Sequence, residues 1–271
     1  MKNFKLFTLV LIILVNYQCT TEKDDFVQEP LQQKISAKLL TKIENLGYDI
    51  NRFPPVLTDD GATIIIERDM LISLKKLKEA SLEKQSYNRA AGLLSCGRAR
   101  EIRVRNNLRA GGAPRRAVSR AINLWNRVSN SNVRFVVVTS GRIDLRIVSA
   151  SLPDGEFPVI ADAFLPEDGR IGGQIRVDET TRTFNNRILT QRQWSNVIAH
   201  ELGHAIGFIH DEESGVRIPG TPNTNITSIM SNRERIGAPN SVENLDDISG
   251  ADKRAIRRMY GGQGNRLCRN F

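Results

Sequence analysis

The hydrophobic residues of this chain follow two different spacings. A helical spacing occurs at 35–46, which ends at Gly47, and at 70–82, 114–128 and 194–206. The last of these segments follows a capping box at 190–193. Short apolar or alternating segments, typical of strands, occur at 63–67, 102–105, 133–138, 143–148, 160–165 and 171–177. Helices interleaved with strands predict an α+β fold on a mixed sheet.

A basic and then apolar N-terminus precedes these elements. Lys2 and Lys5 are followed by an apolar run over 6–15. The run suits a secretory signal and is too short for a transmembrane helix, which needs about 20 residues. We therefore expect residues 1–18 to be a signal peptide and the mature chain to be exported.

The residues around Cys19 resemble the lipidation site of bacterial lipoproteins. The polar stretch 19–25 is similar to the tether and surface-export signal of Bacteroidota lipoproteins, although residues 16–18 depart from the usual lipobox. The resemblance implies an outer-membrane lipoprotein anchored through Cys19, with 19–34 as a polar tether and exposure at the cell surface. An ordinary cleaved secretory signal is the alternative.

Composition indicates a globular protein with a basic surface. Of the 271 residues, 40% are hydrophobic and 25% charged, which excludes collagen, a wholly disordered chain and a polytopic membrane protein. The net charge of +9 can attract nucleic acid, anionic membranes or acidic substrates. No aromatic-interleaved patch or nucleic-acid motif accompanies the arginines, so we expect no nucleic-acid partner.

The basic residues change type along the chain, which suggests a boundary near residues 85–95. Lysines concentrate before it and arginines after it. Residues 35–94 are few for an independent core, so we interpret them as a propeptide or a docking segment. Residues 95–271 are then the main domain, which we expect to be monomeric.

The three histidines of the chain all lie within eleven residues. His200 and His204 are four residues apart, so their imidazoles project from one helix face, about 6 Å apart at Cβ. Gly207 can end the helix and let His210 approach from another direction. Three neutral imidazoles leave a fourth position for water, as in catalytic zinc sites, and Glu201 lies beside the first ligand.

The sequence of residues 200–210, H-E-L-G-H-A-I-G-F-I-H, matches the HExxHxxGxxH signature of the metzincin metallopeptidases. Met230, in Ser-Ile-Met-Ser at 228–231, resembles their methionine turn. The resemblance implies a twisted mixed sheet with an active-site helix and a C-terminal helix. It also implies one zinc ion held by the three histidines, Glu201 as general base, and hydrolysis of peptide bonds in protein substrates.

Other segments resemble narrower groups of metzincins. Residues 160–166 and 169–178 resemble the substrate-binding edge strand and the following strand of matrixins, and 245–261 resembles their closing helix. The most similar group is the bacterial dual-action HEIGH metallopeptidases, which share the stretches at 218–222 and 46–49. The resemblance implies that substrate binds antiparallel to the strand at 160–165.

The two cysteines besides Cys19 have two possible roles. Cys96 and Cys268 in an oxidising compartment are a candidate disulfide. The alternative is that Cys96 resembles the zinc-blocking cysteine of matrixin propeptides.

Several acidic residues are relevant to whether the protein has metal sites besides the three histidines. Asp162 stands where matrixins have a histidine of their structural zinc, so we expect no second zinc. Asp211 follows the third histidine, as the acidic residue of astacins and adamalysins does, and is a candidate anchor for the N-terminus or the methionine turn. Four carboxylates are either calcium ligands or acidic surface loops: Asp154, Asp168, Asp178 and Glu179.

A rival function is an exported binding lipoprotein that keeps the metzincin scaffold without turnover. Replacement of Glu201 would have favoured it, and Glu201 is present.

Overall fold

The computed structural model describes residues 35–58, 60–79, 93–152, 159–182, 188–210, 218–222, 227–231 and 245–261. Cys19, Asp154, Asp211, Cys268 and the side chain of Cys96 lie outside this part. Lipidation and the disulfide therefore stay predictions. No helix in the described ranges is both long and apolar enough to span a bilayer.

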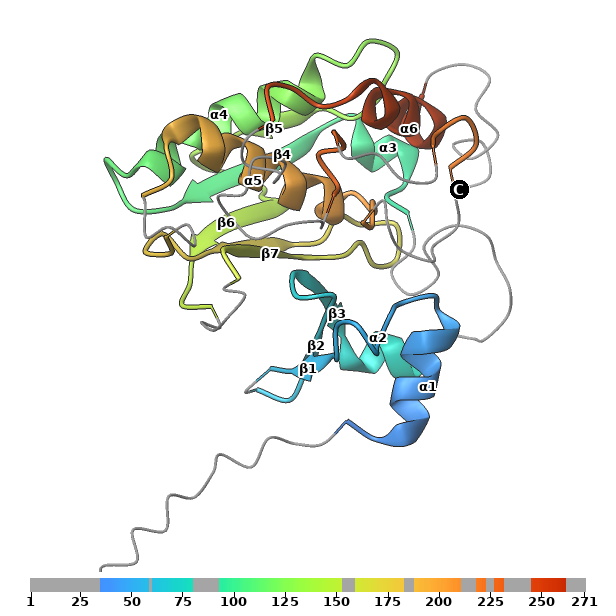
Figure 1. Cartoon of the computed structure of the whole chain (residues 1–271). Helices are drawn as coiled ribbons and strands as arrows, with labels where there is room; N and C mark the ends of the chain where they lie inside the picture. The colour runs from blue at the N-terminus through green and yellow to red at the C-terminus, as the bar shows by residue number, and fades with distance from the viewer. Residues whose placement is uncertain are drawn as a thin grey trace, which may run out of the picture. The chain divides into compact units, whose positions relative to one another are not determined.

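Within the described ranges, eight strands form one mixed sheet in the order β1-β2-β3-β7-β8-β6-β4-β5 (Figure 1). In chain order they are Val56–Leu57 (β1), Thr63–Ile66 (β2), Met70–Ser73 (β3), Ile102–Asn107 (β4), Phe135–Val137 (β5), Leu145–Ser149 (β6), Ala161–Phe164 (β7) and Gln174–Val177 (β8). Strands β4, β5, β6 and β8 run parallel, whereas β7 is antiparallel to β8. The predicted α+β class on a mixed sheet is confirmed.

Two helices, α4 (Ala113–Asn126) and α5 (Gln191–Ala205), pack together against the sheet (Figure 1). The buried Trp125 of α4 donates an indole hydrogen bond to the carbonyl of Ala199 at 2.8 Å. Its ring also stacks on Phe208, with 5.6 Å between centroids. These contacts fix α5, the helix that carries two of the histidines, against the core.

Two further helices, α3 (Cys96–Ala99) and α6 (Gly250–Tyr260), flank this core. The Tyr260 hydroxyl donates to the carbonyl of Ile206 and accepts from the backbone N–H of Leu94. The C-terminal helix is thereby tied to the end of α5.

The N-terminal segment comprises α1 (Ala37–Asn45), strands β1 to β3 and α2 (Leu74–Glu79). The helix predicted over residues 70–82 is wrong in its first part, because Met70–Ser73 form β3. Strand β3 pairs with β2 on one side and β7 on the other, and Met70 to Ile72 are all buried. A strand buried on both faces lacks the alternation that would distinguish it from a helix.

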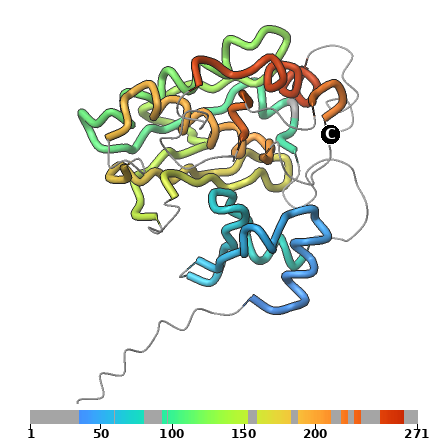
Figure 2. The backbone as a smooth tube through the Cα atoms, viewed as in Figure 1, coloured from blue at the N-terminus to red at the C-terminus, as the bar shows by residue number. Residues whose placement is uncertain are grey.

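The pairing of β3 with β7 also corrects the expectation of an open edge strand at 160–165. Strand β7 is bordered by β8 and, in parallel, by β3, with Met70 opposite Ala163 and Leu71 opposite Phe164. Figure 2 shows the early, cyan part of the chain reaching the later, yellow strand. In this chain the expected substrate position is therefore filled by the chain itself.

Candidate metal centre

Helix α5 begins at the predicted capping box. Thr190 Oγ1 accepts from the backbone N–H of Gln193, and Gln193 Oε1 accepts from the backbone N–H of Thr190 at 2.9 Å. The helix is buried from Trp194 to its end. His200, Glu201 and His204 are consequently presented inside the protein, each at most 5% exposed.

The end of α5 turns the chain so that the third histidine faces the first two. Gly207 has φ 101°, and its N–H bonds the carbonyl of His204 while the N–H of Phe208 bonds that of Gly203. This pair of bonds is a Schellman motif, in which a left-handed glycine ends a helix. It brings His210 within reach of the other two imidazoles.

The three imidazoles converge through their Nε2 atoms. His204 Nε2 lies 2.9 Å from His200 Nε2 and 3.2 Å from His210 Nε2, and the third pair is 3.3 Å apart. Three nitrogens around one tetrahedral zinc at 2.0–2.1 Å would be separated by about 3.3 Å. The arrangement therefore matches the ligand set of a zinc ion.

The other ring nitrogens each face an acceptor, which fixes the tautomers. The Nδ1 atoms of His200 and His204 lie 2.6 Å and 2.8 Å from the carbonyls of Ile229 and Phe208. That of His210 lies 3.2 Å from Glu67 Oε2. With the protons on Nδ1, three Nε2 lone pairs face one another, which is favourable only around a cation. These residues fit a zinc ion.

The segment Ser228–Ser231, the predicted methionine turn, lies directly against α5. A Cβ atom on Gly203 would overlap the sulfur of Met230, so the two residues are in close contact. Asp252, near the start of α6, accepts from the Ser228 hydroxyl at 2.6 Å and from the N–H of Ile229 at 3.0 Å. Since Ile229 also accepts from His200, α6 positions the first histidine through this turn.

Asp252 was missed by sequence reasoning, although a signal for it exists. Residues 249–252, Ser-Gly-Ala-Asp, form a capping box at the start of α6, in which Asp252 also accepts from the N–H of Ser249 at 2.8 Å. Such a Ser-x-x-Asp pattern is visible in the sequence.

Glu201 is 3% exposed, and its Oε2 has no hydrogen-bond partner among the described residues. Burial, together with the negative charges of Asp69 and Asp162, raises the pKa of Glu201 well above its usual range. A carboxylate in such a place accepts a proton readily, as a general base must.

The fourth position is filled by a residue that the sequence analysis did not identify. Asp69 Oδ2 lies 3.3 Å from His200 Nε2 and 3.2 Å from His210 Nε2. Asp69 and the three histidines form the one group with metal-ligand geometry within the described ranges.

The other acidic candidates that the structure describes are engaged within the protein. Asp162 accepts two hydrogen bonds from the Arg176 guanidinium, at 2.8 Å and 2.5 Å. Asp168 lies 2.8 Å from the Lys76 ammonium. Asp178 accepts from the Thr180 hydroxyl at 2.6 Å, and Glu179 accepts from the backbone N–H of Arg109 at 2.9 Å. Calcium binding stays a prediction.

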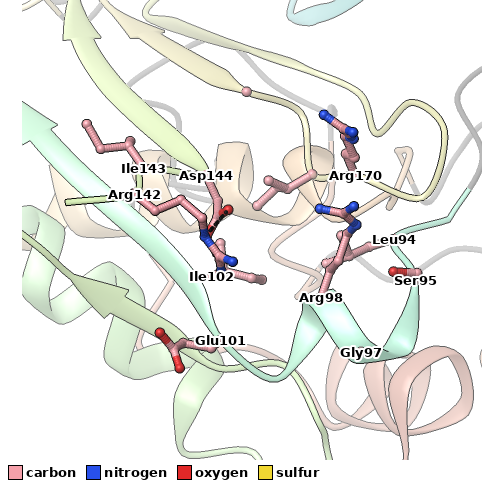
Figure 3. A pocket seen from close by; sticks show the side chains of 12 residues that line it. Leu94, Ser95, Gly97, Arg98, Glu101, Ile102, Arg142, Ile143, Asp144 and Arg170 are labelled. Atoms are coloured by element: carbon pink, nitrogen blue, oxygen red, sulfur yellow. Dashed lines mark hydrogen bonds and ion pairs between the residues drawn. The ribbon is translucent and has the colours of Figure 1, made fainter.

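An open cavity of about 730 Å³ lies elsewhere in the protein. Arg98 and Arg170 line it, and Arg142 within it pairs with Asp144 (Figure 3). None of the three histidines, nor Glu201, borders this cavity, so it is separate from the metal centre.

Comparison with known proteins places this geometry in a family. The matrixin family model matches residues 103–261, more than half of the chain. Interstitial collagenase of Sus scrofa is 35% identical over 107 residues, which are 37% of this chain and 22% of that protein. Matrix metalloproteinase-2 of Drosophila melanogaster is 29% identical over 133 residues, covering 45% and 17%.

Macrophage metalloelastase of Oryctolagus cuniculus is 27% identical over 157 residues, which are 54% of this chain and 28% of that protein. The chain thus spans less than a third of the length of these relatives. The matched region holds the sheet strands β6 to β8, helix α5, the three histidines and the methionine turn. The chain belongs to the matrixin family.

Proposed function

We propose that the protein is a zinc-dependent metalloendopeptidase that hydrolyses internal peptide bonds of protein substrates. The observation that carries this proposal is the convergence of three imidazole Nε2 atoms beside a buried glutamate. Membership of the matrixin family supports it.

His200, His204 and His210 would hold the zinc ion. When bound, the ion supplies a Lewis acid that polarises the scissile carbonyl and lowers the pKa of water to about 7. Glu201 accepts a proton from the attacking water, whose oxygen bonds to the carbonyl carbon. The same carboxyl then delivers a proton to the leaving nitrogen as the C–N bond breaks.

Both sides of β7 are paired, with β8 and with β3, so a substrate strand could add antiparallel to β7 only where β3 is displaced. Within the metzincins, residues 200–210, 218–222 and 46–49 resemble the bacterial dual-action HEIGH metallopeptidases, which supports membership of that group.

Two further residues would support the zinc site. Met230 would lie beneath the zinc, and Gly207 would end the helix so that His210 reaches the ion.

Export as an outer-membrane lipoprotein is proposed from residues 1–25. The test is Cys19→Ala followed by cell fractionation with a lipid label. The variant should leave the membrane fraction and lose the label. An unchanged distribution would reject anchoring through Cys19.

A second candidate function is favoured by Asp69, since four protein ligands around zinc are typical of non-catalytic sites. In that case the protein would be an exported binding lipoprotein without turnover.

The experiment that tests peptidase activity is hydrolysis of a mixed peptide library by residues 20–271, with and without a chelator. Glu201→Gln is the matched variant, with Glu101→Gln on the surface as control. We expect chelator-sensitive internal cleavage that Glu201→Gln loses while binding one zinc per chain. Activity retained in Glu201→Gln would overturn the general-base assignment. Zinc binding without cleavage, also in Asp69→Asn, would favour the binding role.

A further inference from the structure

We propose that the cavity bordered by Arg98 and Arg170 binds a phosphate monoester, with the phosphate group between the two guanidiniums and the organic part against an apolar wall. The cavity has a volume of about 730 Å³, and neither Glu201 nor any of the three histidines borders it. Binding there is independent of the proposed peptidase activity.

The cavity lies where three parallel strands begin. Strands β4, β6 and β8 are neighbours in the sheet and run parallel. Parallel strands start at the same edge of a sheet, so the segments that precede them meet there although they are far apart in the sequence. Segments 94–101, 142–144 and 170–173 come together in this way and, with Ile102, supply the lining of the cavity among the described residues.

Main-chain hydrogen bonds hold the three segments in place. The N–H of Ser95 donates to the carbonyl of Gly169 at 2.9 Å. On the other wall, the N–H of Arg103 donates to Asp144 Oδ2 at 2.9 Å, and the N–H of Asp144 donates to the carbonyl of Arg103 at 2.9 Å. A site whose walls are fixed before binding loses less conformational entropy when a ligand enters.

A tight turn sets the position of Arg170. Glu167 and Arg170 exchange two main-chain hydrogen bonds, at 3.1 Å and 2.8 Å. The two residues between them, Asp168 and Gly169, have φ of 51° and 69°. Positive φ at both central residues is typical of the type I′ turn. Arg170 therefore leaves this turn at a defined point on the cavity wall.

The carboxylates that border the cavity already have cationic partners. Glu101 Oε1 lies 2.6 Å from Nε of Arg103, and Asp144 Oδ1 lies 3.2 Å from Nε of Arg142. Figure 3 shows the pair of Arg142 and Asp144 within the cavity. These carboxylates therefore do not neutralise the other cations of the wall.

Arg98 and Arg170 are the cations that stay without a partner. Within the described ranges, neither guanidinium has a hydrogen bond or an ion pair, and both side chains are exposed to solvent. Figure 3 shows the side chain of Arg98 pointing from α3 toward Arg170. Both also border an adjoining cavity of about 480 Å³, where Asp168 lies 2.8 Å from Lys76 and Glu167 accepts a backbone hydrogen bond. Two unpaired guanidiniums on one cavity favour an anion between them.

A phosphate monoester matches this pair in charge and in shape. It carries about −1.5 to −2 at pH 7, against the two positive charges, whereas a carboxylate carries one negative charge. Each guanidinium presents its donors in a planar fork that binds two phosphate oxygens at once. Leu94, Ile102 and Ile171 are buried and supply the apolar wall for the organic part. The volume lies within the range of roughly 300–1,000 Å³ typical of small-molecule sites.

The test is calorimetric titration of the zinc-loaded mature chain, residues 20–271, with phenyl phosphate and with benzoate. We expect saturable binding of phenyl phosphate, tighter than that of benzoate. Arg98→Gln and Arg170→Gln should each weaken it by about tenfold, because each removes charged hydrogen bonds. The matched control is Arg100→Gln, which removes the same charge two residues from Arg98 but does not border the cavity, and it should bind as wild type. Circular dichroism establishes that each variant is folded.

Two sources share this chemistry, a soluble phosphate ester and the headgroup of a phospholipid. Sedimentation with phosphatidylcholine vesicles, with and without phosphatidic acid, distinguishes them. Vesicle binding that requires both phosphatidic acid and the two arginines would support the site with a lipid as its ligand. Saturable binding of phenyl phosphate without vesicle binding would support it with a soluble one.

Three results would overturn the site. Phenyl phosphate binding that Arg98→Gln and Arg170→Gln leave unchanged would mean that the phosphate binds elsewhere, such as at the zinc ion. Equal losses in Arg98→Gln and Arg100→Gln would mean general attraction by the net charge of +9. Absence of saturable binding, or equally tight binding of benzoate, would reject a phosphate site. None of these results changes the test of peptidase activity.

Discussion

The sulfur of Met230 occupies the space that a side chain on Gly203 would need. The indole of Trp125 borders the same spot, with its Cζ2 atom 3.2 Å from the position of such a Cβ. Gly203, the fourth residue of the HELGH sequence, therefore allows helix α5 to lie directly on the turn around Met230. The second x of HExxH is thus a packing requirement in this chain.

Gly203→Ala should destabilise the protein. Helix propensity alone favours alanine by about 1 kcal/mol, but overpacking a buried contact costs about 1–3 kcal/mol. We expect a net loss of up to about 2 kcal/mol in the free energy of unfolding, measured by urea denaturation. Gly173→Ala is the control, because nothing lies within 4 Å of its added Cβ. A loss in Gly203→Ala that persists undiminished when Met230 is also replaced by alanine would contradict the contact.

Asp252→Asn should weaken zinc binding, although Asp252 is not one of the candidate zinc ligands. The Asp252 carboxylate accepts hydrogen bonds from Ser228, Ile229 and Ser249. The amide of asparagine has only one oxygen to accept from these three donors. We expect a loss of about 1–3 kcal/mol in the free energy of unfolding, together with weaker zinc binding by competition with a chelator. The matched control is Asp247→Asn, whose surface pairs with Arg127 and Lys253 contribute at most about 1 kcal/mol. Equal effects of both variants would argue against the link from α6 to His200.

Zinc removal should lower the melting temperature of the full chain. Three Nε2 lone pairs face one another, so the ion stabilises the folded state over the unfolded one. At a zinc concentration a thousand times the dissociation constant, the stabilisation is about 4.1 kcal/mol. Calorimetry with and without a chelator measures it, and His204→Ala should remove the difference. A wild-type melting temperature insensitive to the chelator would refute the site.

Asp162 should make the free energy of unfolding depend weakly on pH, and the sign of this dependence follows from its pKa shift. Burial raises the pKa of Asp162, and the hydrogen bonds from Arg176 only partly offset this. The folded state then holds the proton more tightly than the unfolded one, so the contribution of Asp162 falls as pH rises from its unfolded pKa of about 3.9 through the folded pKa. Urea midpoints of wild type relative to Asp162→Asn should decrease over this window. A relative increase would mean that the ion pair outweighs burial.

Local patterns were sufficient to predict the half of the site carried by α5. The structure has the three local features that the sequence predicts, each of which involves only a few residues. They are a capping box, two histidines at helical spacing and a glycine after the last turn of the helix. Asp69 lies 131 residues before His200 and reaches it only because β3 pairs with β7. No local signal marks one carboxylate of the N-terminal segment above the others, and the same pairing made residues 70–73 a strand where a helix was predicted.

Because Asp69 belongs to the same chain as the histidines that it faces, its carboxylate lies beside them whatever the protein concentration. A single carboxylate is a weak zinc ligand in solution, but a tethered group acts at an effective concentration in the millimolar range.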